Sequence, residues 1–234
     1  HCDSIFKSDY FPINDNSKIY DYDVFEYMIT EFHNNDIKVH AWINPYRVRT
    51  TDSDVNKLNP QSPIYKWLTD DDTLNDRNVC INNGIYLNPA SSEVQGLIIN
   101  GIREIIENYS IDGIAFDDYF YPTTDAEFDK LSYEEYKSTA KKPLCLEDWR
   151  RTNVNTLISG CYNAIKAKSE AIIFSISPSH SIEKNYNELY ADAKFWVKNG
   201  IVDVIIPQLY FGFLYPQEEY RFDNLLSVWK KLSA

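Results

Sequence analysis

The fold is decided by one stretch, Ile111-Asp112-Gly113-Ile114-Ala115-Phe116-Asp117-Asp118-Tyr119-Phe120-Tyr121-Pro122. It has the pattern of a short buried strand that ends in two acidic residues and a run of aromatics. Side chains alternate across a strand, so Gly113, Ala115 and Asp117 share one face. This face carries small side chains and ends in a polar one. The isoleucine and phenylalanine between them form a bulky opposite face. This pattern favours a parallel α/β barrel with helices over the bulky face and Asp117 at the mouth, where barrel enzymes hold their catalytic groups.

Acidic pairs more often cap a turn or a helix than perform chemistry, and this alternative applies to Asp117 and Asp118. Three further predicted strands also end in a polar residue on the presumed inward face: Asn44, Ser177 and Gln208. Because the carboxyl ends of barrel strands meet at one mouth, we expect these side chains to converge with Asp117 on one pocket. The alternative for each is a satisfied polar group of the barrel core.

The composition limits the class of protein. A chain of 234 residues is most simply one domain, residues 1–234. The formal net charge of −12 disfavours a nucleic-acid partner, because a polyanion would be repelled. Aromatic residues make up 15% of the chain, a surplus compatible with stacking on sugar rings. No apolar run reaches the length of a membrane span.

The four cysteines form no Cys-x-x-Cys motif and no cluster with histidine, which disfavours a zinc site. Their spacing leaves the disulfide state open. We expect neither a metal nor an organic cofactor. The chain starts at His1 without a signal-peptide pattern, so any segment that targets the protein is expected to lie outside these residues.

Apolar periodicity predicts helices alternating with strands. Helices are expected at residues 21–35, 64–68, 92–109, 147–168, 186–199 and 218–232, and strands at 37–43, 85–87, 171–177 and 202–210, besides the central one. Ser132 and Glu135 offer a capping box for one more short helix. The long connection over residues 45–90 favours a functional role at the same end as Asp117. Arg150 and Arg151 are expected to form ion pairs at the surface.

Several motifs, in order along the chain, resemble bacterial glycoside-hydrolase-like family ten. They are Cys2-Asp3-Ser4 with Lys7-Ser8, His40-Ala41-Trp42-Ile43-Asn44-Pro45-Tyr46-Arg47, Tyr86-Leu87-Asn88-Pro89, Asp112-Gly113-Ile114 with residues 116–122, Asp148-Trp149-Arg150-Arg151-Thr152-Asn153-Val154, Ser175-Ile176-Ser177-Pro178 and Pro207-Gln208-Leu209-Tyr210. Together they span nearly the whole chain, so the resemblance is specific.

The resemblance implies a TIM-type (β/α)8 barrel, an extracytoplasmic location in the cell envelope or outside the cell, and glycosidase action on a polysaccharide. Peptidoglycan glycan strands are the substrate class it implies. It also implies that the first strand and most of the second precede His1, and that the last two strands follow Ala234. We therefore expect an incomplete barrel with an open sheet, whose unpaired edges invite self-association.

Glycoside hydrolysis generally uses two carboxyl groups that flank the scissile bond. Asp117 is the first candidate, and Asp118 is expected to orient it or to bind a sugar hydroxyl. Asp3 is the leading candidate for the second carboxyl group, and Glu183 is a weaker one. The predicted substrate-binding residues are Asn44, Tyr46, Arg47, Tyr119, Ser177, Gln208 and Tyr210, of which Tyr46, Tyr119 and Tyr210 would stack on sugars.

Two other functions compete with glycoside hydrolysis. A non-catalytic barrel could bind glycans through the same tyrosines without a working carboxyl pair. A metal-dependent hydrolase could use Asp117, Asp118 and His40, although the sequence holds no spaced ligand motif for a metal. His40 lies one pleat below the predicted mouth and is more simply a core or supporting residue.

Overall fold

The computed structural model describes residues 2–232, and a parallel sheet of four strands lies at its centre. The strands are β1 (His40–Ile43), β5 (Gly113–Phe116), β6 (Ile173–Ile176) and β7 (Val204–Ile205), in the order β1-β5-β6-β7. Each strand pairs with its neighbour in parallel. β1 and β7 form the edges, so the sheet is open within the described residues, as the sequence predicts.

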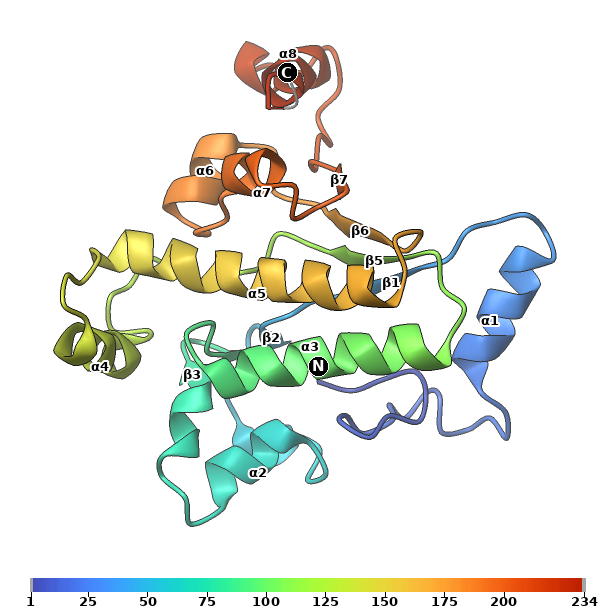
Figure 1. Cartoon of the computed structure of the whole chain (residues 1–234), viewed down its shortest axis with the longest axis horizontal. Coiled ribbons are helices and arrows are strands. Elements are labelled where there is room, and N and C mark those ends of the chain that lie inside the picture. The colour runs from blue at the N-terminus through green and yellow to red at the C-terminus, as the bar shows by residue number, and fades with distance from the viewer. Residues whose placement is uncertain (1, 233–234) are drawn as a thin grey trace.

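Two long helices, α3 (Ser92–Asn108) and α5 (Leu146–Lys168), lie side by side over one face of this sheet (Figure 1). On that face Ile114 and Phe174 are fully buried. On the opposite face, Trp42 and Ile206 are 74% and 51% exposed. The predicted division of the sheet into a face covered by helices and an opposite face is therefore confirmed, and the closure of a barrel around that opposite face stays a prediction.

α3 illustrates why these helices form where they do. The hydroxyl of Ser91 caps its first turn by accepting a hydrogen bond of 3.2 Å from the backbone N–H of Val94. Apolar residues at helical spacing form its buried stripe: Val94, Ile98, Ile102, Ile105 and Ile106. This stripe fixes the helix against the core and sets the direction in which the chain enters β5.

A smaller antiparallel sheet is built from the long connection after β1. It contains β2 (Arg47–Arg49), β3 (Val79–Ile81) and β4 (Ile85–Leu87), in the order β2-β4-β3, beside α2 (Pro63–Thr69), η1 (Val55–Lys57) and η2 (Asn75–Asn78). Gly84 precedes β4, where a Cβ would lie 2.2 Å from the carbonyl oxygen of Arg49. A side chain at this position would therefore collide with the backbone of β2.

The remaining helices are α1 (Val24–His33), α4 (Lys130–Thr139), α6 (Ile182–Asn187), α7 (Ala193–Lys198), η3 (Glu218–Tyr220) and α8 (Phe222–Lys230). The single helix predicted at residues 186–199 is wrong, because Tyr190 adopts a positive φ of 54° and separates α6 from α7. The strand predicted at residues 202–210 is shorter than expected. β7 covers only Val204 and Ile205, although the backbone N–H groups of Ile206 and Gln208 still donate to the carbonyl oxygens of Ile176 and Pro178 at 2.9 Å.

Two smaller predictions also fail. The capping box at Ser132 does not form, since α4 begins two residues earlier with Asp129 at the N-cap. Arg150 does not lie at the surface: its side chain is fully buried and pairs with Asp129. Arg151 pairs with Asp148, whose side chain is 51% exposed, and so comes closer to the expectation.

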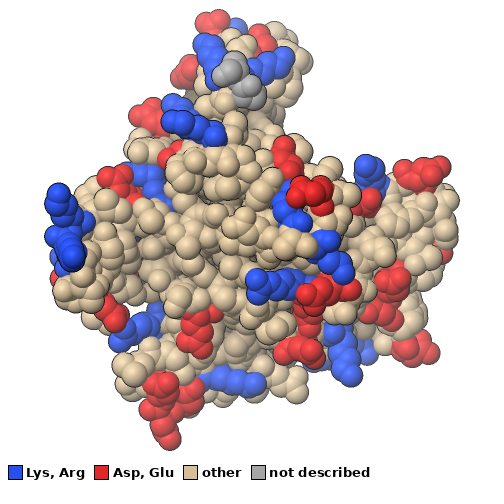
Figure 2. Space-filling model, viewed as in Figure 1, with Lys and Arg blue, Asp and Glu red and all other residues tan. Residues whose placement is uncertain are grey.

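The described residues include no helix with both the length and the apolar character that crossing a membrane requires. The four cysteines are unpaired thiols. On the face shown in Figure 2, basic side chains lie among acidic ones rather than in one continuous patch.

Candidate active site

A row of polar residues forms at the C-terminal edge of the parallel sheet. The last paired residues of β1, β5 and β6 lie opposite one another, so the residues that follow them, Asn44, Asp117 and Ser177, are neighbours. The side-chain amide of Asn44 donates a hydrogen bond of 2.9 Å to Oδ2 of Asp117. The backbone N–H of Ser177 donates to the carbonyl oxygen of Phe116 at 2.8 Å. Strand register alone therefore produces the predicted convergence around Asp117.

Asp117 is buried, with 4% of its surface exposed, and both carboxylate oxygens have partners. Oδ1 accepts a hydrogen bond of 3.2 Å from the backbone N–H of Tyr119, while Oδ2 accepts the one from Asn44. Nη2 of Arg47 lies 3.7 Å from Oδ2. Burial raises the pKa of Asp117, the Asp118 carboxylate raises it further, and the donors and Arg47 oppose the rise. The result is a carboxyl group of raised pKa.

Asp118 points to the other side of the row. Its Oδ1 accepts a hydrogen bond of 3.0 Å from Nε2 of Gln208, which also donates to the carbonyl oxygen of Ser177 at 3.0 Å. The backbone N–H of Gln208 donates to the carbonyl oxygen of Pro178. Gln208 thus ties the chain after β7 to the ends of β5 and β6, and the two adjacent carboxylates diverge as strand geometry predicts.

His180 is a residue of this edge that the sequence analysis missed. It lies in the loop after β6, and its ring meets the rings of Phe211 and Tyr220 at 4.9 Å and 5.4 Å between centroids. Burial and the Lys184 ammonium lower the pKa of His180, against the influence of the Asp118 carboxylate. Its position shortly after the strand end at Ser177 was the available sequence signal.

The three predicted stacking tyrosines have different environments. Tyr119 is 46% exposed, and the guanidinium of Arg47 lies 3.6 Å from the centre of its ring. Tyr210 is 83% exposed. Tyr46 is only 1% exposed, so the prediction that it stacks on a sugar is wrong for this structure. Its ring faces the hydrophobic core behind the site, because the chain turns into β2 directly after Asn44.

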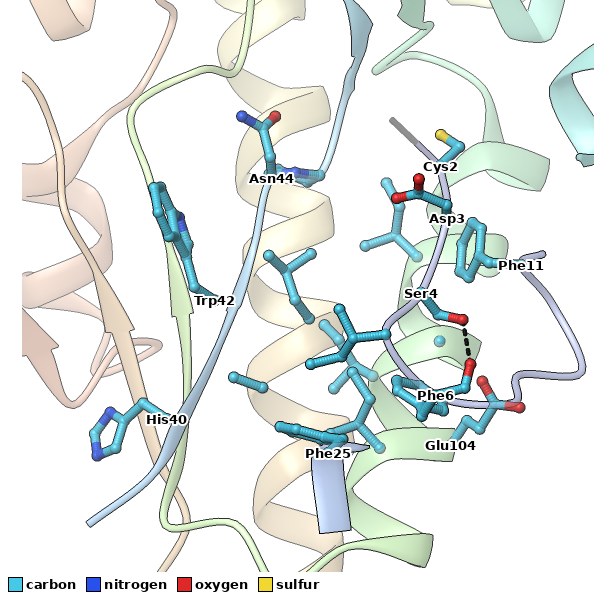
Figure 3. A pocket seen from close by; sticks show the side chains of 18 of the residues that line it. Cys2, Asp3, Ser4, Phe6, Phe11, Phe25, His40, Trp42, Asn44 and Glu104 are labelled. Atoms are coloured by element: carbon cyan, nitrogen blue, oxygen red, sulfur yellow. Dashed lines mark hydrogen bonds between the residues drawn. The ribbon is translucent and has the colours of Figure 1, made fainter. Parts of the chain in front are cut away.

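Asp3 and Asn44 line the same cavity, which has a volume of about 480 Å³ (Figure 3). Asp3 lies on the N-terminal segment, across the cavity from the end of β1. Its side chain is exposed, and no hydrogen bond or ion pair joins it to Asp117 within residues 2–232. Glu183, the weaker candidate, is exposed in the first turn of α6. The catalytic roles of Asp117, Asp118 and Asp3 stay predictions.

His40 is exposed and lies against Gly113, where an added Cβ would come within 2.7 Å of its ring. It therefore supports the inward face below the row of polar residues. In the described part of the chain, no group of three histidine, cysteine, aspartate or glutamate side chains is arranged to hold a metal ion.

Solved structures define the class of fold. The glycoside hydrolase domain of PgaB (BpsB) from Bordetella bronchiseptica superposes with a TM-score of 0.62 at 11% identity, over 99% of this chain and 66% of that one. Alpha-L-fucosidase isoenzyme 2 from Paenibacillus thiaminolyticus gives a TM-score of 0.50 at 15% identity, over 74% of this chain and 25% of that one. The chain thus has an α/β fold shared with glycoside hydrolase domains.

Sequence comparison then identifies the family. Residues 2–231 match the family described as glycosyl hydrolase-like 10, and the chain belongs to it. Glycosyl hydrolase YngK of Bacillus subtilis (strain 168) is 33% identical over 229 residues, which cover 89% of this chain and 42% of YngK. Glycosyl hydrolase DigH of Escherichia coli (strain K12) is 33% identical over 232 residues, covering 89% of this chain and 50% of DigH. The chain spans about half the length of these relatives or less.

Proposed function

We propose that this chain contributes the middle part of a (β/α)8 barrel that hydrolyses glycosidic bonds in a polysaccharide, with peptidoglycan glycan strands as the substrate. Membership of the glycosyl hydrolase-like family, and relatives that are named glycosyl hydrolases, support the reaction class. Peptidoglycan lies outside the cytoplasm, so the proposal includes an extracytoplasmic location. The net charge of −12 also favours a glycan over a nucleic acid as partner.

The observation that carries this proposal is the environment of Asp117. Both of its oxygens accept hydrogen bonds, from Asn44 and from the backbone of Tyr119, and these contacts fix the orientation of the carboxyl group. Burial meanwhile raises its pKa, the direction of shift that suits a carboxyl group for proton transfer nearer neutral pH. Asp117 is therefore the first member of the proposed catalytic carboxyl pair.

The second carboxyl group must lie across the scissile bond from the first. Asp3 is the proposed partner of Asp117, because it lines the cavity that Asn44 also lines, and Asn44 is hydrogen-bonded to Asp117. Asp118, held by Gln208, would bind a sugar hydroxyl.

A pair of substitutions tests the proposal. Asp117→Asn keeps the shape of the side chain and should reduce turnover of glycan strands by about 100-fold or more while binding is largely kept. Tyr119→Ala should instead weaken binding by about tenfold through lost stacking. Asp125→Asn, which changes an exposed carboxylate in the same connection, is the matched control.

Product release is measured by mass analysis and binding by calorimetry on the same glycan strands. Full turnover in Asp117→Asn would remove Asp117 from the mechanism. Tight binding without turnover by the unmodified protein would favour the non-catalytic glycan-binding barrel.

A further inference from the structure

Three tyrosines lie side by side on the surface of the segment that leads into α1. Tyr20, Tyr22 and Tyr27 are 48%, 49% and 53% exposed. Tyr22 is in the middle, with its ring centroid 5.4 Å from that of Tyr20 and 5.5 Å from that of Tyr27. Scattered apolar residues are normal at a protein surface, whereas adjacent half-exposed rings form a patch that indicates binding. We call these three residues the tyrosine cluster.

The tyrosine cluster lies at the opposite end of the parallel sheet from the candidate active site. α1 contacts the connection between α3 and β5: Tyr109 donates a hydrogen bond of 2.5 Å to Asp23 at the N-cap of α1, and His33 in its last turn lies 2.9 Å from Asp112. This connection precedes β5, so α1 lies by the edge at which the strands begin, beyond the end of α3 (Figure 1). Asp117 follows the other end of β5. The cluster is therefore separate from the site proposed for cleavage.

The backbone beneath the tyrosine cluster is well anchored. Oδ1 of Asp23 accepts hydrogen bonds from the backbone N–H groups of Phe25 and Glu26 at 2.9 and 3.0 Å, which caps α1. Phe25 is buried, and its ring centroid lies 5.8 Å from that of Phe6 and 4.8 Å from that of Tyr109. Because the cluster is attached to this support, little conformational entropy should be lost when a ligand stacks on its rings.

The polar groups of the tyrosine cluster suit a ligand rich in hydroxyl groups. Residues 2–232 supply no hydrogen-bond partner for the three tyrosine hydroxyls or for the carboxylate of Asp21. Two other carboxylates of this segment are already occupied: Asp15 pairs with Lys18 at 3.0 Å, and Asp23 accepts the three hydrogen bonds given above. Sugar rings offer apolar C–H faces for stacking, and their hydroxyls donate to and accept from such groups. A phosphate or an anionic lipid suits the cluster poorly, because Lys18 is the only lysine or arginine among residues 15–32.

We propose that the tyrosine cluster is a second glycan-binding site, which holds the uncharged faces of sugar rings in a polysaccharide away from the point of cleavage. Three half-exposed rings are small beside the roughly 800 Å² that each partner of a stable protein complex covers, but they suit a short run of sugar units. A polymer held at both sites gains apparent affinity without a new contact at the first. The inference rests on the proposed function only for the identity of the polymer.

The test measures binding to insoluble peptidoglycan glycan strands by sedimentation, and turnover of a short soluble oligosaccharide prepared from the same strands. Tyr22→Ala removes the central ring of the cluster, and Tyr22→Phe removes only its hydroxyl. Tyr10→Ala is the matched control, because Tyr10 is 38% exposed but lies outside the cluster. Circular dichroism of each variant checks that it is folded.

Tyr22→Ala should bind the insoluble strands about tenfold more weakly than the unmodified protein, and Tyr22→Phe should keep most of the affinity, because stacking needs the ring. Tyr10→Ala should bind like the unmodified protein. Turnover of the short oligosaccharide should be the same in all four proteins, because it is too short to reach from the cluster to the site of cleavage.

Equal binding of the strands by Tyr22→Ala and the unmodified protein would overturn the inference, as would no binding by the unmodified protein. Binding that about 0.5 M salt abolishes would also overturn it, since stacking on uncharged faces is not screened. A dimer of the unmodified protein that Tyr22→Ala abolishes would assign the cluster to a second copy instead.

Hydrolysis is followed separately, so the two proposals can fail independently. Binding of the strands that depends on Tyr22, without product release from either substrate, would leave this inference standing and remove the proposed hydrolysis. Product release from the strands, with equal binding by Tyr22→Ala and the unmodified protein, would do the reverse.

Discussion

Replacing Asp129 with alanine should lower the free energy of unfolding by about 3–5 kcal/mol, because it leaves a charged arginine buried without its counter-ion. The side chains of Arg150 and Asp129 are both fully buried and are joined by contacts of 2.5, 3.1 and 3.2 Å. Without Asp129, the hydrogen bonds left to Arg150 go to the carbonyl oxygen of Asp125 at 2.7 Å and the hydroxyl of Tyr190 at 3.2 Å. Neither group carries a charge.

The neighbouring ion pair of α5 provides the matched control. Arg151 contacts Asp148 at 2.6 Å, but the Asp148 side chain is 51% exposed. Asp148→Ala should therefore cost no more than about 1 kcal/mol. The double variant Arg150→Met with Asp129→Leu should lose less than the sum of the single losses, because it removes both charges together.

Urea unfolding followed by circular dichroism measures all of these variants. A loss below 1 kcal/mol for Asp129→Ala, equal to that of Asp148→Ala, would refute the reasoning. The pair also anchors the connection that follows Asp118, because the ring of Tyr121 lies 5.1 Å from the guanidinium of Arg150. Loss of turnover in Asp129→Ala is expected wherever the protein remains folded.

Two further predictions concern the site and the sheet. Arg47→Met should move the limb of the pH profile that reports Asp117 to higher pH, because it removes a positive charge that lowers the pKa of Asp117. Asp118→Asn should move the same limb to lower pH, because it removes a negative charge that raises this pKa. A pH profile of kcat/KM measures both shifts, and shifts that are absent or opposite in sign would contradict the assigned contacts. Gly113→Ala should destabilise the protein, because the added Cβ would lie 2.6 Å from a histidine ring of β1 and 2.7 Å from a backbone carbonyl oxygen of β6. Gly96→Ala, in open space on α3, should instead stabilise it by about 0.5–1 kcal/mol in urea unfolding.

Local periodicity was enough to predict the elements that hold the site. The stripe of α3 and the alternation of β5 are strong patterns, and both elements lie where the sequence predicts them. The convergence of Asn44, Asp117 and Gln208 also follows from the sequence, because parallel strands bring their carboxyl ends together. The roles of these residues in chemistry stay predictions.

Features that depend on distant partners could not be predicted in this way. Arg150 is buried because Asp129 and Tyr190 come from other segments to meet it, and nothing beside it in the sequence signals this. Tyr46 was expected at the mouth, but the turn into β2 carries its ring into the core. His180 was missed because it meets Phe211 only through folding of the loop after β6.

The most direct test of the central claim is the digestion of peptidoglycan glycan strands in heavy-oxygen water, followed by mass analysis of the products. If hydrolysis depends on Asp117, the unmodified protein should place one heavy oxygen from water at each newly formed reducing end. Asp117→Asn should give no such product. Cleavage products without heavy oxygen, or the same labelled products from both proteins, would contradict the account.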